Sequence, residues 1–301
     1  MVIEWSRVTN MTHTVRSVTH RFPGVPTVEG AGVRLRRSFS NPEVPLFDPF
    51  LLLDRFGSSN PVDYLAGFPW HPHRGIETVT YVLNGQVAHG DTLGNSGIIG
   101  SGDVQWMNSG SGIIHQEMPQ RTEGTMSGFQ LWVNLPSQEK MSVPAYRGLS
   151  ASDIPEVTTD PGNRVKVVAG TFEGVEGPVR GIPVDPTYLD VRVPPSGTFE
   201  VPTHPEYTAF AHAIDGNGTF SGTDPKPVAG GETALLGPGK AVRVQAGEQG
   251  LRFLLVSGRP LHEPVAWYGP IVMNRPDELA EAMRELRNGD FVKHRQPIRE
   301  E

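Results

Sequence analysis

The chain has 301 residues, enough for two domains of ordinary size, and its 26 basic and 33 acidic residues give a formal net charge of −7. This acidic balance argues against a general nucleic-acid binder, which carries a basic patch, but leaves open a protein that binds another DNA-binding protein. The chain has no cysteine, which excludes disulfides, thiolate metal sites and cysteine nucleophiles, so any bound metal is held by nitrogen and oxygen ligands.

Hydropathy and turn residues set the broad class. No apolar run approaches the ~18 residues of a membrane span, and the N-terminus lacks the apolar core of a signal peptide, so we expect a cytoplasmic protein without a membrane partner. The 35 glycines and 28 prolines follow no regular period. Many turns between short strands explain them best, which favours an all-β fold.

The first half of the chain contains most of the clear strand patterns. Residues 12–40 alternate weakly, and residues 45–53 form a short apolar run that predicts a buried strand or extended segment. Residues 78–83 are rich in β-branched and aromatic side chains and predict a strand. Asn84-Gly85 then predicts a two-residue hairpin turn, with residues 86–89 returning beside that strand. Further strands are expected at 104–107, 113–118 and 128–135.

The second half repeats this style after a polar segment. Residues 137–163 are predicted to link two barrels, the first over 1–136 and the second over 164–301. Strand-like segments in the second half lie at 164–169, 188–193, 207–214, 233–236, 241–244 and 251–256. One helix is expected at about 276–288. Pro276 suits its first position, and apolar residues recur at helical spacing until Asn288-Gly289 ends it.

The candidate metal ligands come in two pairs. His71 and His73 are separated by one residue, and so are His115 and Glu117. In an extended strand, residues at i and i+2 point to the same face, so each pair can converge on one ion. Three imidazoles and one carboxylate suit iron(II), manganese, nickel, cobalt, copper or zinc. One histidine pair alone is a weak signal, and the second pair in a glycine-rich all-β chain strengthens it.

Several neighbouring residues are less convincing ligands. Glu77 shares the parity of His73 but lies about 13 Å further along a straight strand, so it is interpreted as a residue that supports the ligands from behind or forms the wall beside the site. His89 would pair with Thr80 across a two-residue turn, so it is expected to point to the opposite face. Arg74 is interpreted as an exposed ion-pair partner in preference to a steering charge, and Trp106 as a core residue in preference to a substrate wall. The histidines of the second half form no such pair, so the second barrel is predicted to be free of metal.

The segments 71–81, 102–107 and 112–119 resemble the pirin family of the cupin superfamily, and the likeness extends to 48–54 and 269–274. This resemblance implies two tandem cupin barrels, that is, double-stranded β-helix or jelly-roll barrels. It also implies metal in the first barrel, with His71, His73, His115 and Glu117 as ligands. In many cupins the glutamate of the first motif, here Glu77, is a ligand. In pirins the later glutamate takes that role.

The resemblance also implies two alternative functions. One is a quercetin 2,3-dioxygenase that opens a flavonol ring with O2, with Fe(2+) as the expected cofactor and a flavonol-like substrate. In that reading Glu117 is also the catalytic base, which accepts the proton of the flavonol 3-hydroxyl. The other is a non-enzymatic, iron-dependent regulatory protein that acts through a protein partner. Neither alternative involves direct contact with nucleic acid.

Overall fold

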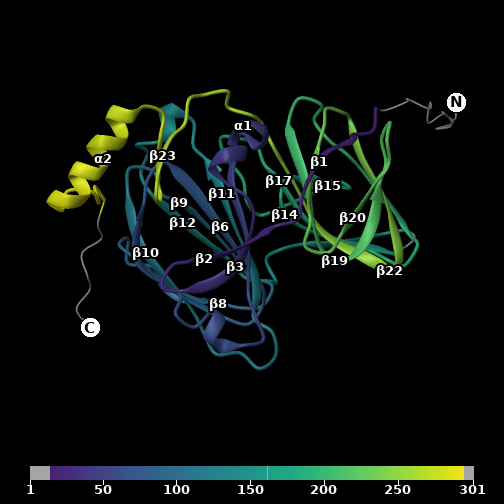
Figure 1. The fold of residues 1–301 in the computed structure, drawn as a ribbon, viewed down its shortest axis with the longest axis horizontal. Coiled ribbons are helices and arrows are strands. Elements are labelled where there is room, and N and C mark those ends of the chain that lie inside the picture. Colours follow the sequence, from purple (N-terminus) through teal and green to yellow (C-terminus); the bar gives the residue numbers. More distant parts are fainter. Residues whose placement is uncertain (1–13, 161, 295–301) are drawn as a thin grey trace, which may run out of the picture.

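The computed structural model describes residues 14–160 and 162–294, which form two β-barrels lying side by side (Figure 1). The predicted all-β class with two cupin-type barrels and a short C-terminal helix is confirmed. Among the described residues, no helix has the length and apolar character needed to cross a bilayer.

The first barrel is built from two sheets. The smaller sheet has the strand order β5 (Phe68–His73), β10 (Ile113–Pro119), β7 (Val87–Asp91) and β8 (Ser96–Ile99). The larger sheet has the order β12 (Ala145–Leu149), β9 (Val104–Asn108), β6 (Ile76–Asn84), β11 (Ser127–Asn134), β4 (Phe50–Phe56), β3 (Val33–Phe39) and β2 (Val25–Glu29). Four single-turn helices lie between strands: η1 (Asn41–Glu43), α1 (Val44–Phe47), η2 (Pro61–Asp63) and η3 (Ser137–Glu139). The apolar run at 45–53 is therefore part helical turn and part strand.

The turn at Asn84-Gly85 does not form the predicted hairpin. Strand β6 pairs with β9 and β11, whereas β7 pairs with β8 and β10. The turn therefore carries the chain from one sheet to the other. Gly85 has φ +100°, and a Cβ there would lie 2.3 Å from Sδ of Met126, so only glycine fits this crossing.

The second barrel is closed around an apolar interior. Its main sheet has the order β1 (Val18–Phe22), β21 (Thr233–Leu236), β19 (Thr208–Phe220), β22 (Ala241–Gly258), β17 (Thr187–Val193), β14 (Asn163–Ala169) and β13 (Glu156–Thr159). In the same sheet β18 (Thr198–Pro202) pairs with β22, and β20 (Lys226–Ala229) pairs with β19. A small hairpin is formed by β15 (Thr171–Phe172) and β16 (Val175–Glu176). Phe199, Phe220 and Phe253 are among the buried side chains that fill this barrel.

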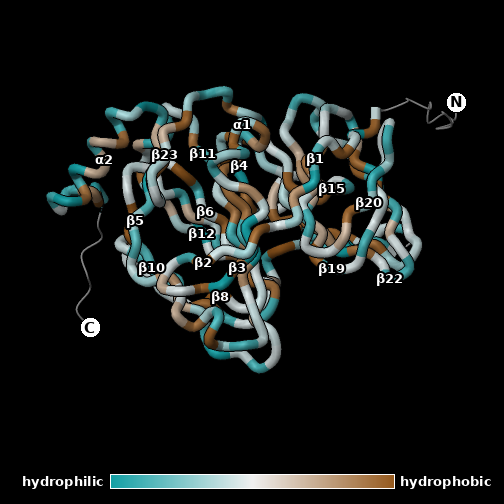
Figure 2. The backbone as a smooth tube through the Cα atoms, in the orientation of Figure 1, coloured by the Kyte–Doolittle hydropathy of each residue, from teal (hydrophilic) through white to brown (hydrophobic). Residues whose placement is uncertain are grey.

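The two barrels share a hydrophobic core. It joins Val79, Trp106 and Phe129 of the first barrel with Tyr188 and Leu254 of the second, which confirms Trp106 as a core residue. Figure 2 shows hydrophobic segments where the barrels meet. Burial of this shared face gives both barrels a common source of stability.

Each end of the described chain packs on the barrel formed by the other half of the sequence. Strand β1, near the N-terminus, pairs with β21 of the second barrel. The C-terminal segment, with β23 (Ala266–Tyr268), β24 (Ile271–Met273) and α2 (Pro276–Asn288), packs on the first barrel, and Figure 1 shows α2 beside β10. The predicted helix at 276–288 is confirmed. The predicted linker contributes β12 to the first barrel and β13 to the second.

Candidate metal centre

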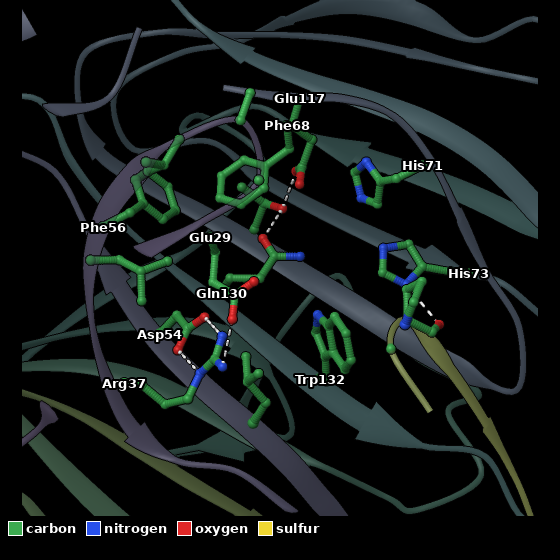
Figure 3. Close-up of a pocket in the computed structure, with 18 of the residues that line it drawn as sticks. Glu29, Arg37, Asp54, Phe56, Phe68, His71, His73, Glu117, Gln130 and Trp132 are labelled. Atoms are coloured by element: carbon green, nitrogen blue, oxygen red, sulfur yellow. Dashed lines mark hydrogen bonds and ion pairs between the residues drawn. The ribbon is translucent and has the colours of Figure 1, made fainter. Parts of the chain in front are cut away.

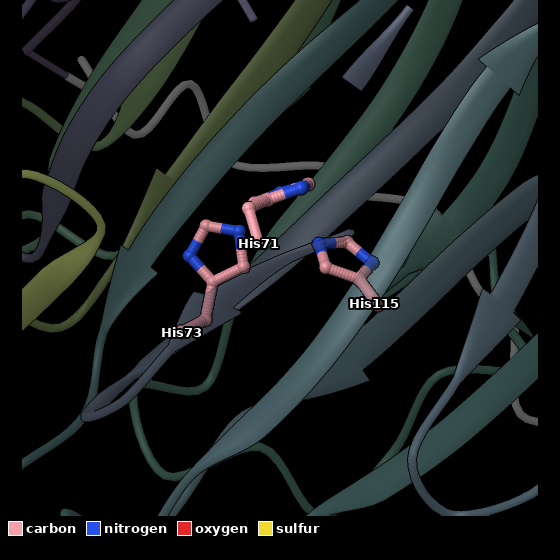
Figure 4. A group of neighbouring side chains, drawn as sticks. All are labelled: His71, His73 and His115. Carbon is pink, nitrogen blue, oxygen red and sulfur yellow. The ribbon is translucent and has the colours of Figure 1, made fainter. Parts of the chain in front are cut away.

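Three histidines meet inside the first barrel, on its smaller sheet (Figure 4). His115 of β10 lies directly opposite His71 of β5 in the antiparallel register, and His73 follows on the same face. Each ring offers one nitrogen, and these nitrogens lie within 4.8 Å of one another. The structure therefore brings together three of the four predicted ligands, on one face of the sheet as the i, i+2 spacing predicts.

Hydrogen bonds to backbone carbonyls orient two of these rings. Nδ1 of His71 donates to the carbonyl of Pro69 at 2.8 Å, and Nδ1 of His73 donates to the carbonyl of Pro270 at 3.2 Å. Each bond fixes the ring and leaves Nε2 as the free lone pair, as in many metal sites. Pro270 lies in the C-terminal segment, so that segment helps to shape the centre.

His115 is buried, and neither of its ring nitrogens has a hydrogen-bond partner among the described residues. Unpaired buried nitrogens are costly, and coordination of a metal by one of them removes part of that cost. Burial, reinforced by the neighbouring histidines, holds the pKa values of His73 and His115 well below the ordinary range. These imidazoles are therefore neutral near pH 7, the form that binds metal ions. The residues fit a metal ion.

Glu117 lies on the same inner face but outside this group of three. Its carboxylate Oε1 accepts a hydrogen bond of 2.6 Å from the hydroxyl of Thr80, and Thr80 also contacts Gln130 at 2.7 Å (Figure 3). Thr80 has one hydroxyl hydrogen, which goes to the carboxylate because a charged acceptor forms the stronger hydrogen bond. The role of Glu117 as ligand and base stays a prediction.

Glu77 points away from the metal centre. The chain bends at Gly75, which has φ +77°, so β5 and β6 belong to different sheets and parity does not carry across. Glu77 Oε2 instead accepts from Nε1 of Trp106 at 3.0 Å, on the face that packs against the second barrel. Burial raises the pKa of Glu77 to about 7. The interpretation of Glu77 as a wall residue is therefore wrong.

His89 lies inside the barrel, contrary to the prediction. It is opposite Glu117 in the β7–β10 register, and its ring centroid lies 5.6 Å from that of His115. Its Nε2 is 3.2 Å from Oδ2 of Asp91, and its ring stacks on Tyr146. The prediction failed because it assumed that β6 and β7 pair. The sequence does contain one indication that His89 lies near the site: His89 and Asp91 have the same i, i+2 spacing as the two ligand pairs.

Arg74 is buried rather than exposed, also contrary to the interpretation. It is 1% accessible, and its Nη2 donates to Glu285 Oε2 at 2.6 Å and to the carbonyl of Phe291 at 3.0 Å. Its guanidinium also lies 4.3 Å from the ring centroid of Phe291. Arg74 therefore anchors α2 and the residues after it to the segment that carries His73.

A cavity of about 720 Å³ opens beside the histidines (Figure 3). His71, His73 and Glu117 line one end, and Leu35, Phe56, Phe68, Trp70 and Trp132 are among its apolar lining. Residues 267–270 of the C-terminal segment complete the wall. Its volume and largely apolar lining are typical of small-molecule sites.

Known proteins resemble this chain over both barrels. The Pirin family model matches residues 32–133, and the Pirin C-terminal cupin domain model matches residues 188–292. The chain is 45% identical over 278 residues to a pirin-like protein of Caulobacter vibrioides, covering 92% of this chain and 99% of that protein. It is 41% identical over 265 residues to pirin of Homo sapiens, covering 86% and 88%.

A solved structure adds to these relatives. The crystal structure of a quercetin 2,3-dioxygenase from Acinetobacter baumannii matches with a TM-score of 0.84 at 31% identity, covering 92% of this chain and 98% of that one. Two family models and full-length relatives thus cover both barrels of this chain. The chain belongs to the pirin family.

Proposed function

We propose that the protein is a metal-dependent dioxygenase of the quercetin 2,3-dioxygenase type, which opens a flavonol ring with O2. The observation that carries this proposal is the cluster of three histidines at the end of a largely apolar cavity of about 720 Å³. The similarity to a solved quercetin 2,3-dioxygenase supports the same substrate class.

His71, His73, His115 and Glu117 are the residues proposed to hold the ion, with Fe(2+) as the proposed metal. When bound, the metal supplies Lewis acidity that lowers the pKa of a coordinated hydroxyl, together with the redox chemistry that O2 requires. Glu117 is proposed to accept the proton of the flavonol 3-hydroxyl, because its carboxylate lines the cavity beside the histidines. Thr80 holds that carboxylate in place. Phe68 and Trp132 offer flat apolar surfaces for the flavonol rings and exclude water.

The test is oxygen consumption by iron-loaded protein with quercetin, next to a His73→Ala variant. We expect consumption in the wild type and none above background in the variant, with iron content measured for both. Absence of turnover in wild-type protein that holds iron would reject the dioxygenase.

A second candidate function is the iron-dependent regulatory protein. Trp70 and Tyr268, which line the cavity, are 55% and 62% exposed, and exposed aromatic side chains favour protein contacts. This candidate gains support if the wild-type protein holds iron but turns over no flavonol. It requires a partner whose binding is lost in the double variant Trp70→Ala, Tyr268→Ala.

A further inference from the structure

A charged cluster lies at the end of the cavity opposite the histidines (Figure 3). Arg37 of β3 and Asp54 of β4 face each other in the antiparallel register. Nε and Nη2 of Arg37 donate to the two carboxylate oxygens of Asp54 at 2.8 and 2.7 Å, and Nη1 donates to Oε1 of Glu29 at 2.8 Å. These bonds hold the three side chains in one fixed arrangement.

The cluster still has hydrogen-bonding capacity that faces the cavity. A guanidinium has five N–H groups, and Arg37 uses three of them in these bonds. Oε2 of Glu29 accepts no hydrogen bond among the described residues, and the Glu29 side chain is 42% exposed. One guanidinium against two carboxylates leaves this end of the cavity with an excess of negative charge. It therefore favours neutral hydrogen-bond donors over anions.

The two ends of the cavity thus select different chemistry. The histidine end suits a hydroxyl that loses its proton to Glu117, whereas Leu35, Phe56 and Trp132, which also line the cavity, suit aromatic rings. A phenolic hydroxyl at the charged end can donate to Glu29 and accept from Arg37 at the same time. An aromatic ring without hydroxyls would make neither bond.

We propose that Glu29, held by Arg37, is a specificity-determining residue that binds hydroxyl groups on the part of the ligand remote from the metal. The ligand is accordingly a flavonol or similar polyphenol that is hydroxylated on its pendant ring. This inference rests on the proposed function for the identity of the ring system. A hydrogen bond between a hydroxyl and a partly exposed carboxylate is worth about tenfold in affinity.

The experiment compares quercetin, which has two hydroxyls on its pendant ring, with galangin, which has none there. Iron-loaded wild type, Glu29→Gln and the control Glu123→Gln are titrated with each flavonol by calorimetry without oxygen, and turnover is then measured in air. Glu29→Gln keeps the side-chain size and presents an amide NH2 where Oε2 was. Glu123 undergoes the same chemical change on an exposed loop that does not line the cavity. Thermal unfolding of each variant checks folding.

We expect wild type and Glu123→Gln to bind quercetin about tenfold more tightly than galangin, and Glu29→Gln to show less than about threefold preference. Equal binding of both flavonols by the wild type, or an undiminished preference in Glu29→Gln, would overturn the inference. A preference in binding that depends on Glu29, without any turnover in air, would reject the dioxygenase proposal and leave the ligand class in place. Wild type that binds neither flavonol would reject both.

Discussion

The hydroxyl of Thr80 on β6 donates a hydrogen bond of 2.6 Å to Oε1 of Glu117 on β10, so a residue of the larger sheet fixes the carboxylate of the smaller one. Thr80→Val keeps the shape of the side chain and removes this donor. We expect kcat for quercetin to fall about tenfold while iron content changes little, because the bond orients a base and leaves the histidines untouched.

The matched control for this variant is Thr78→Val. Thr78 lies on the same strand, two residues earlier, and its buried hydroxyl has no hydrogen-bond partner among the described residues. Its replacement should leave both kcat and iron content near the wild-type values. Equal losses in the two variants would show that any change inside the barrel lowers turnover, and that Thr80 does not act through Glu117.

Metal binding should stabilise the folded protein. An ion that binds the native state at 100 times its Kd adds about 2.7 kcal/mol to the free energy of unfolding, which corresponds to several degrees in Tm for a chain of this size. We expect iron(II) to raise the Tm of the wild type and a chelator to reverse the rise. His115→Ala should show no such rise, and an iron-dependent rise that persists in this variant would place the ion elsewhere.

Glu77 should make stability depend on pH. Burial raises its pKa from the ordinary value of 4.5 to about 7 in the folded state. Between these two values the unfolded chain loses the proton and the folded chain keeps it, so the free energy of unfolding falls as pH rises. The loss approaches about 3 kcal/mol above pH 7.

The variant Glu77→Gln keeps the hydrogen bond from Trp106 and cannot titrate. Urea unfolding of both proteins at about pH 5 and pH 8 isolates the contribution of this one group, because the other titrating groups cancel in the difference. We expect wild type to lose stability relative to the variant at the higher pH. Parallel pH profiles would mean that Glu77 titrates normally.

The ion pair between Arg74 and Glu285 should affect the metal centre from a distance. Glu285→Gln leaves the buried guanidinium of Arg74 without its carboxylate, and we expect a loss of about 3 kcal/mol in the free energy of unfolding. It also loosens the C-terminal segment whose Pro270 carbonyl orients His73, so iron affinity should fall about tenfold by chelator competition. Glu281→Gln, which removes an exposed pair on the same helix, should change neither quantity. Unchanged iron affinity in Glu285→Gln would show that the position of α2 does not affect the metal centre.

The features that could be predicted from the sequence are those set by local periodicity. The i, i+2 spacing placed His71, His73 and His115 on one face because each pair lies within a single strand. Apolar spacing, a proline at the start and a glycine at the end likewise gave the bounds of α2, since helix termini depend on adjacent residues.

The features that were missed depend on which strands share a sheet. Parity does not carry across the turns at Gly75 and Gly85, where the chain changes sheets, so a period of two predicts the wrong face for Glu77 and His89. The bond from His73 to Pro270 joins residues 197 positions apart, and no local pattern predicts such a contact. The burial of Arg74 is equally hidden from local patterns, because its carboxylate partner lies 211 positions away.

The return of the C-terminal segment to the first barrel has a consequence for protein synthesis. A ribosome makes His71, His73, His115 and Glu117 long before it makes Pro270 and Glu285. A nascent chain therefore carries every proposed ligand well before the carbonyl that orients His73 exists. We therefore expect full iron affinity only once the C-terminal segment has been made and packed, and a premature stop before Pro270 should weaken a metal centre whose proposed ligands are all present.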